Sequence, residues 1–84
     1  MIVVRISETI VYPYDVYCAM VEQIKTHLTS FGEISVGEVR DMFEASRKYA
    51  LALMEYLDTQ RVTKRIGDKR ILFWHLPVLI NYNG

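Results

Sequence analysis

The 84-residue chain has a single cysteine, Cys18, and only two histidines, His27 and His75. One cysteine cannot close an internal disulfide, so a small secreted scaffold held by disulfides is excluded. The two histidines match no metal-ligand spacing, and we expect neither a metal site nor a cofactor. The four glycines are isolated from one another, so there is no glycine-rich phosphate loop and no GTPase motif. We therefore expect no catalytic residues and no enzymatic activity.

Long apolar runs are also missing. The longest run, from Ile71 to Trp74, ends at His75, whereas a membrane span needs roughly 20 apolar residues. The start of the chain lacks the charged region, long apolar region and cleavage site of a signal peptide. We therefore expect a cytoplasmic protein that does not contact a membrane. The length predicts one domain over residues 1–84, and we expect a monomer.

The net charge of zero hides an asymmetry between the two parts of the chain. Residues 1–46 contain three basic and seven acidic residues, which gives a net charge of −4. Residues 47–84 contain seven basic and three acidic residues, which gives +4. A polyanionic partner would therefore meet the second part. The alternative interpretation is an ordinary solvated surface with uneven charge.

The apolar pattern predicts three helices within residues 14–60. The first runs from Tyr14 to Phe31, with Pro13 suited to its first turn and Gly32 to its end. Its expected apolar stripe consists of Val16, Met20, Val21, Ile24, Leu28 and Phe31. The second helix runs from Val36 to Phe43. Ser35 and Glu38 have the spacing of a capping box at its start, and Val39, Met42 and Phe43 should face inward.

The third helix is capped by Ser46 and should run to about Gln60. Its apolar stripe consists of Ala50, Leu53, Met54 and Leu57. Arg47 and Lys48 lie in its first turn, where cations oppose the helix dipole and cost a few tenths of a kcal/mol each. Because free N–H groups in this turn also favour anions, the helix start is a candidate phosphate site. For Tyr49 a core position is the favoured interpretation, with base stacking as the alternative.

The remaining segments favour strands. Residues 1–12 form a lead-in segment, in which Ile2 to Ile6 is a strand that Ile10 to Tyr12 continues or pairs with. Residues 62–74 predict a hairpin in which Gly67-Asp68-Lys69 joins strands Val62–Ile66 and Arg70–Trp74. The tail, residues 75–84, contains Pro77, which argues against a central strand. Its apolar part is expected to form an edge strand or to cover a groove.

The hairpin has four cations, Lys64, Arg65, Lys69 and Arg70, around Gly67. Like charges on paired strands repel, so this arrangement is unfavourable unless something neutralises it. The order strand–helix–short strand–helix–helix–hairpin is that of an α+β winged helix with three helices and a small antiparallel sheet. Its second and third helices make a helix-turn-helix with a tight turn at Glu44-Ala45, and the start of the third helix usually faces nucleic acid.

Several separated motifs resemble the last winged-helix domain of the selenocysteine-specific translation elongation factor (SelB) family. The resemblance covers roughly Val3 to Phe73, and the Ser-Arg-Lys-Tyr-Ala and Gly-Asp-Lys-Arg pieces are its most specific parts. The matching stretches are Gly32 to Val36, Arg40 to Phe43, Ser46 to Leu51, Glu55 to Asp58 and Val62 to Arg70.

This resemblance implies a domain that grips the messenger RNA hairpin (SECIS) directing selenocysteine insertion during translation. It also implies that the parent factor is a GTPase, of which this chain is a fragment or a free-standing relative. RNA contacts would come from the start of the third helix and from the wing. Carried over by position, the RNA-binding residues are Arg47, Lys48, Tyr49, Lys64, Arg65, Gly67, Lys69 and Arg70. Such RNA is recognised through phosphates, shape and unstacked loop bases.

Two other functions stay open for a winged helix. A DNA-binding regulator would place the third helix in a major groove and needs polar base readers there. The face of this helix offers Leu51, Ala52 and Glu55 instead, which suits that role poorly. A protein-interaction winged helix would use the apolar tail, Leu76 to Ile80, as its interface, and its binding would lack a steep salt dependence.

Overall fold

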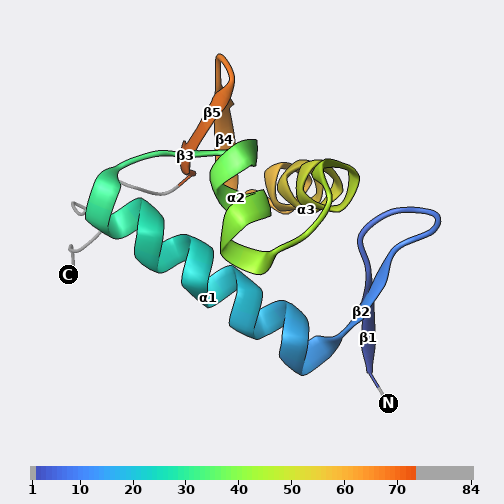
Figure 1. Ribbon diagram of the computed structural model, residues 1–84. Coiled ribbons are helices and arrows are strands. Elements are labelled where there is room, and N and C mark those ends of the chain that lie inside the picture. Colours follow the sequence, from blue (N-terminus) through green and yellow to red (C-terminus); the bar gives the residue numbers. More distant parts are fainter. Residues whose placement is uncertain (1, 74–84) are drawn as a thin grey trace, which may run out of the picture.

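The computed structural model describes residues 2–73, and Figure 1 shows how their elements are arranged. In chain order the elements are β1 (Val3–Arg5), β2 (Val11–Pro13), α1 (Tyr14–Phe31), β3 (Ile34–Ser35), α2 (Val36–Phe43), α3 (Arg47–Thr59), β4 (Thr63–Ile66) and β5 (Lys69–Leu72). The predicted winged helix is confirmed. The expectations for Trp74 and for the tail, 75–84, lie outside the described residues. No helix within residues 2–73 has the length and apolarity that a membrane crossing requires.

Helix α1 has the predicted ends. It stops where Gly32 takes a left-handed conformation at φ +85° and donates its N–H to the Leu28 carbonyl at 2.8 Å. Glycine adopts this conformation without a Cβ penalty, which is why it ends helices. Pro13 was expected in the first turn, but it is the last residue of β2 and stands just before the helix. It pairs there with Val3 at the edge of a short strand, where a missing N–H is tolerated.

The core lies between the three helices, with Ile34 of β3 and with Ile6 and Ile10 of the segment that joins β1 and β2. Leu72 of the wing packs against it, partly buried. The middle of α1 buries Met20, Val21, Ile24 and Leu28, and α3 buries the four residues of its predicted stripe. Two expected core residues of α1 are wrong, because Val16 is 43% exposed and Phe31 is 72% exposed. An 18-residue helix is about 27 Å long. In Figure 1 its ends extend beyond the elements that cover its middle.

The predicted capping box at the start of α2 is confirmed. The Ser35 side chain accepts a hydrogen bond from the Glu38 N–H at 3.1 Å, and Glu38 Oε1 accepts one from the Ser35 N–H at 2.8 Å. The inward positions also agree, since Val39 is fully buried and Met42 and Phe43 pack partly buried against the core. The box fixes the direction in which α2 leaves β3.

The capping box predicts a pH dependence of stability. The hydrogen bond from the Ser35 N–H is the main cause that lowers the pKa of Glu38. Because the pKa is lower in the folded than in the unfolded state, ionised Glu38 stabilises the fold at neutral pH. This contribution is lost as the pH falls below about 4 and through the folded-state pKa. In thermal denaturation, Glu38→Gln should be less stable than the wild type at neutral pH, with a smaller difference in acid. An equal difference at both pH values would contradict this.

Helix α3 follows α2 after the predicted tight turn. Glu44 takes a left-handed conformation at φ +52°, and the Ala45 N–H donates to the Arg40 carbonyl at 3.0 Å. Ser46 then caps α3, accepting a hydrogen bond from the Tyr49 N–H at 3.3 Å. These contacts set the angle at which the first turn of α3 emerges from the core.

The strands form two separate antiparallel sheets. In one, β1 pairs with β2, which decides the open expectation for the lead-in segment in favour of pairing. In the other, the order is β3-β5-β4, and β4 and β5 form the wing. The wing loop is shorter than predicted, because Lys69 pairs with Ile66 and only Gly67 and Asp68 lie between the strands. Gly67 has φ +63°, which a two-residue hairpin turn requires and glycine readily adopts.

Candidate nucleic-acid interface

The first turn of α3 presents its charged residues to solvent. Arg47 and Lys48 are both exposed, and neither forms an ion pair within residues 2–73. Two uncompensated cations therefore stand at a helix N-terminus, where they oppose the helix dipole. An anion bound at this point would be attracted both by the side chains and by the free N–H groups.

Tyr49 is not a core residue, and its favoured interpretation was wrong. It is 44% exposed, and Lys48 Nζ lies 5.9 Å from the centroid of its ring. The buried stripe of α3 begins at Ala50, so Tyr49, one residue earlier, lies at the border between the buried and the exposed faces of this helix. Tyr12 of β2 is near, and the pKa of Tyr12 is raised by burial and by the neighbouring Tyr49. An exposed ring beside a cation is suited to stacking against an unstacked base.

Two of the four wing cations are neutralised by carboxylates. Lys69 Nζ lies 2.9 Å from Glu33 Oε2, and this contact raises the pKa of Lys69. Arg70 is only 2% exposed and donates from Nε and Nη2 to Asp58 Oδ2, at 3.2 and 3.1 Å. These carboxylates offset the repulsion that was expected between the cations of the paired strands.

The other two wing cations stay available. Lys64 and Arg65 are exposed on β4, and neither forms an ion pair within residues 2–73. Arg65 donates from Nε to the Gly67 carbonyl at 2.8 Å, which fixes the direction of its side chain while the terminal nitrogens remain free to bind. The wing thus offers two unpaired cations beside the turn.

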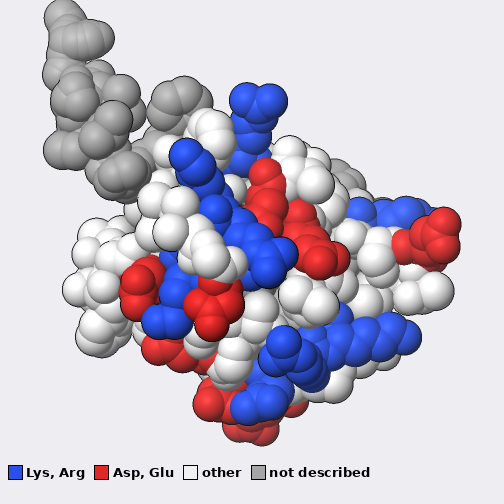
Figure 2. Space-filling model, turned by 90° about the horizontal axis from the view of Figure 1, so that it is seen from above, with Lys and Arg blue, Asp and Glu red and all other residues white. Residues whose placement is uncertain are grey.

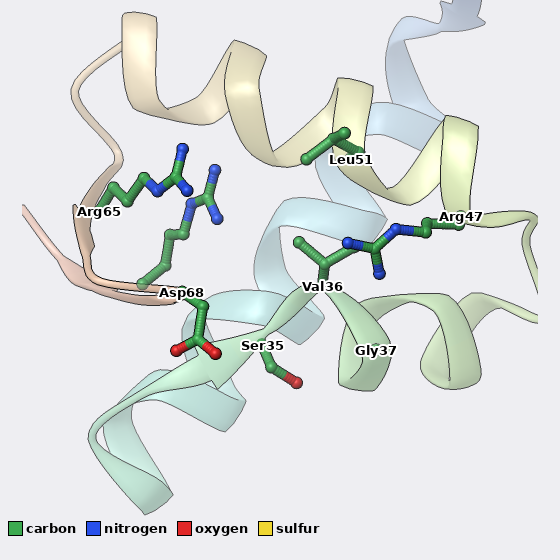
Figure 3. A pocket seen from close by; sticks show the side chains of 8 residues that line it. Ser35, Val36, Gly37, Arg47, Leu51, Arg65 and Asp68 are labelled. Carbon is green, nitrogen blue, oxygen red and sulfur yellow. The ribbon is translucent and has the colours of Figure 1, made fainter.

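A hollow of about 240 Å³ lies between the start of α3 and the wing. Figure 3 shows Arg47 and Arg65 approaching it from opposite sides, with Leu51 above and the Ser35–Gly37 segment below. The hollow is lined by Ser35, Val36, Gly37, Arg47, Leu51, Arg65, Asp68 and Arg70. Arginine side chains and a helix N-terminus around a hollow of this size suit a phosphate group.

The surface around this hollow is mixed in charge. Figure 2 shows blue Lys and Arg side chains gathered on the face that carries the wing, with acidic side chains between them. Within residues 2–73, no group of three or more His, Cys, Asp or Glu side chains is placed to hold a metal ion.

Sequence reasoning missed several residues at this site. It assigned no part in ligand binding to the start of α2 or to Asp68, both of which line the hollow, and it placed Leu51 on an exposed helix face. It also missed Asp58 as the partner of Arg70. One signal was available for Asp58, because an acidic residue in the last turn of a helix opposes the helix dipole.

Comparison of the sequence with models of known protein families identifies the family of this winged helix. A family model described as "Elongation factor SelB, winged helix" matches residues 26–72, which is more than half of the chain. The chain belongs to this family. The match spans the last third of α1, then β3, α2, α3 and the wing, so it includes every SelB-like motif from Gly32 to Arg70. The resemblance seen in the sequence is therefore confirmed.

Two SelB relatives extend the comparison. The chain is 32% identical over 69 residues to a selenocysteine-specific elongation factor of Desulfomicrobium baculatum; the match covers 82% of this chain and 11% of that protein. It also matches a solved structure, the mRNA-binding domain of elongation factor SelB from E. coli in complex with SECIS RNA. That match has a TM-score of 0.78 and 25% identity, and it covers 84% of this chain and 59% of the other. This SelB winged helix thus spans about a tenth of the curated relative.

Proposed function

We propose that this chain is the RNA-binding winged-helix domain of a selenocysteine-specific elongation factor and recognises a SECIS-type mRNA hairpin during translation. The observation that carries the proposal is that Arg47 and Arg65 face one hollow from α3 and from the wing, and that neither forms an ion pair within residues 2–73. The SelB relative of known structure, with a TM-score of 0.78, was solved in complex with SECIS RNA, which supports the same ligand for this fold.

The eight residues assigned from the sequence have different proposed roles. Arg47, Lys48, Lys64 and Arg65 are exposed and contact RNA phosphates directly. Tyr49 stacks on an unstacked loop base.

The remaining three residues shape the wing. Gly67 makes its tight turn, and Lys69, the first residue after this turn, joins β5 to Glu33 near β3. Arg70 is 2% exposed and bound to Asp58, so its main proposed role is to support the wing. It also lines the hollow, and its contact with RNA stays a prediction.

The domain acts by binding and not by catalysis. Residues 2–73, the part of the chain that the structure describes, form one winged-helix unit of a larger cytoplasmic factor, whose other parts supply the GTPase activity. In this proposal the domain binds the mRNA as a monomer. The hollow receives a phosphate or base of the hairpin loop, because unstacked loop nucleotides are the part of RNA that proteins read specifically.

The proposal predicts a preference for an RNA hairpin over a DNA duplex. Binding of the chain to a small RNA stem-loop and to a DNA duplex of matched length is measured by fluorescence anisotropy across a salt series. The stem-loop should bind more tightly at every salt concentration, and log affinity should fall linearly with log salt. Equal and weak binding of both ligands contradicts RNA recognition. Tighter binding of the duplex indicates a DNA-binding regulator instead.

A further inference from the structure

Asp58, in the last turn of α3, joins this helix to both strands of the wing. Its Oδ1 accepts a hydrogen bond from Thr63 Oγ1 of β4 at 2.6 Å, and its Oδ2 accepts two from Arg70 of β5, at 3.2 and 3.1 Å. Thr63 is 1% exposed and Arg70 is 2% exposed, so both groups that donate to Asp58 are shielded from water, whereas the Asp58 side chain is 24% exposed. Charge-assisted hydrogen bonds of this kind fix orientation as well as distance.

The same carboxylate decides which wing arginine is available. Arg65 and Arg70 are directly opposite each other in the register of β4 and β5. Like charges at paired positions repel, and both arginines line the hollow. Asp58 engages Arg70 from the side of α3, whereas Arg65 forms no ion pair within the described part of the chain.

Loss of the Asp58 charge would leave Arg70 buried without a counter-ion, which is strongly unfavourable. The strain is relieved when the wing moves away from α3, or when the Arg70 side chain turns into the hollow. Both responses displace Arg65, because it shares the strand pairing and the hollow with Arg70. Arg47 and Arg65 therefore face each other across the hollow only while Asp58, which does not line the hollow, holds Arg70 in place.

We propose that Asp58 is a positioning residue for RNA recognition. It holds Arg70 against α3, and through Arg70 it keeps Arg65 facing the hollow opposite Arg47. This inference rests on the proposed function. The position of Asp58 agrees with it, because an acidic residue in the last helical turn is unfavourable for the helix itself and gains its stabilisation from the wing.

The decisive variant is Asp58→Asn, because charge and positioning predict opposite effects. Removal of a negative charge near a polyanion site should strengthen RNA binding if only the charge matters. Positioning predicts instead that the RNA stem-loop binds roughly tenfold more weakly at fixed salt, which corresponds to the loss of one charged contact. Anisotropy is measured at a temperature where circular dichroism shows the variant to be folded. Binding that is unchanged or tighter overturns the proposal.

A matched control separates positioning from loss of stability. Thr63→Val removes one hydrogen bond of the same network but keeps the Asp58–Arg70 ion pair. It should lower the melting temperature and leave RNA affinity unchanged. If Asp58→Asn does not fold, Asp58→Asn combined with Arg70→Met removes both charges of the ion pair and should restore folding. That double variant should still bind RNA more weakly than Thr63→Val, and equal binding of the two overturns the proposal.

A measurement on the free protein distinguishes this inference from the proposed function. Residual dipolar couplings of backbone amides report the orientation of the wing relative to α3. Asp58→Asn should change the couplings of β4 and β5, and Thr63→Val should not. If the wild type fails to bind the stem-loop, the proposed function fails. If the couplings of Asp58→Asn equal those of the wild type, the positioning role fails, whatever the wild type binds.

Discussion

Replacing both arginines of the hollow, in the double variant Arg47→Ala/Arg65→Ala, should weaken binding of the RNA stem-loop by at least about 100-fold. Each arginine offers a charged hydrogen bond of about 1.5–3 kcal/mol, so the loss of two amounts to about 3–6 kcal/mol. The salt dependence should also flatten by roughly 1.5–2 units of log-log slope, because two fewer phosphates are neutralised. Both quantities come from fluorescence anisotropy across a salt series.

The control for this variant is Arg5→Ala/Lys25→Ala, which removes the same net charge from β1 and α1. If long-range attraction alone held the RNA, the two double variants would lose affinity to the same extent. We expect a small loss for the control, because neither of its residues lines the hollow. All four residues are exposed, so the fold should survive in both variants.

The second large effect is expected in the core. Ile24→Ala should lower the free energy of unfolding by about 2–5 kcal/mol, because Ile24 is fully buried and the cavity cannot close completely. The free energy of unfolding of small domains lies in the lower part of the usual range of about 5–15 kcal/mol, so the variant loses a large share of its stability. Its melting temperature should fall by at least about 10 °C. Urea and thermal denaturation measure both quantities.

The matched control is Val16→Ala, on the same helix and in the same apolar stripe. Val16 is 43% exposed, so its truncation should change the free energy of unfolding by no more than about 0.5 kcal/mol. Comparable losses for the two variants would contradict the burial described for α1. The two variants together therefore test where along α1 the apolar stripe changes from buried to exposed.

The ends of the helices were predictable because their signals are local. The Ser35–Glu38 capping box, the Ser46 cap and the left-handed Gly32 each depend on contacts within four residues along the chain. Such contacts form whenever the segment becomes helical, whatever the rest of the fold does. The four buried residues of α3 followed in the same way from the helical period.

The helical period of the apolar residues did not predict burial correctly at the ends of the helices. It assigns Val16, Phe31 and Tyr49 to a face or to its border, but it does not say how far the opposite layer reaches. Val16 is the third residue of α1 and Phe31 is its last, whereas the buried residues of this helix, Met20 to Leu28, lie between them. Burial there depends on the sizes of all the packed elements, which only the assembled fold contains.

Local sequence patterns likewise could not predict which of the wing cations form ion pairs. In the sequence, Lys64, Arg65, Lys69 and Arg70 are equivalent positive charges within one hairpin. Strand pairing brings Lys69 to Glu33, 36 positions earlier in the chain, and the packing of α3 brings Arg70 to Asp58, 12 positions earlier. These two cations are thereby engaged, whereas Lys64 and Arg65 form no ion pair within residues 2–73.

The sequence by itself determined the helices, their caps, the wing and the division of charge between the two parts of the chain. Each of these follows from residue type and short spacing, because hydrogen bonds at caps and turns reach only a few residues. The tertiary structure decided which of the eight assigned residues face solvent and which support the wing. That choice depends on strand register and helix packing, because both bring distant carboxylates within hydrogen-bonding distance of particular cations.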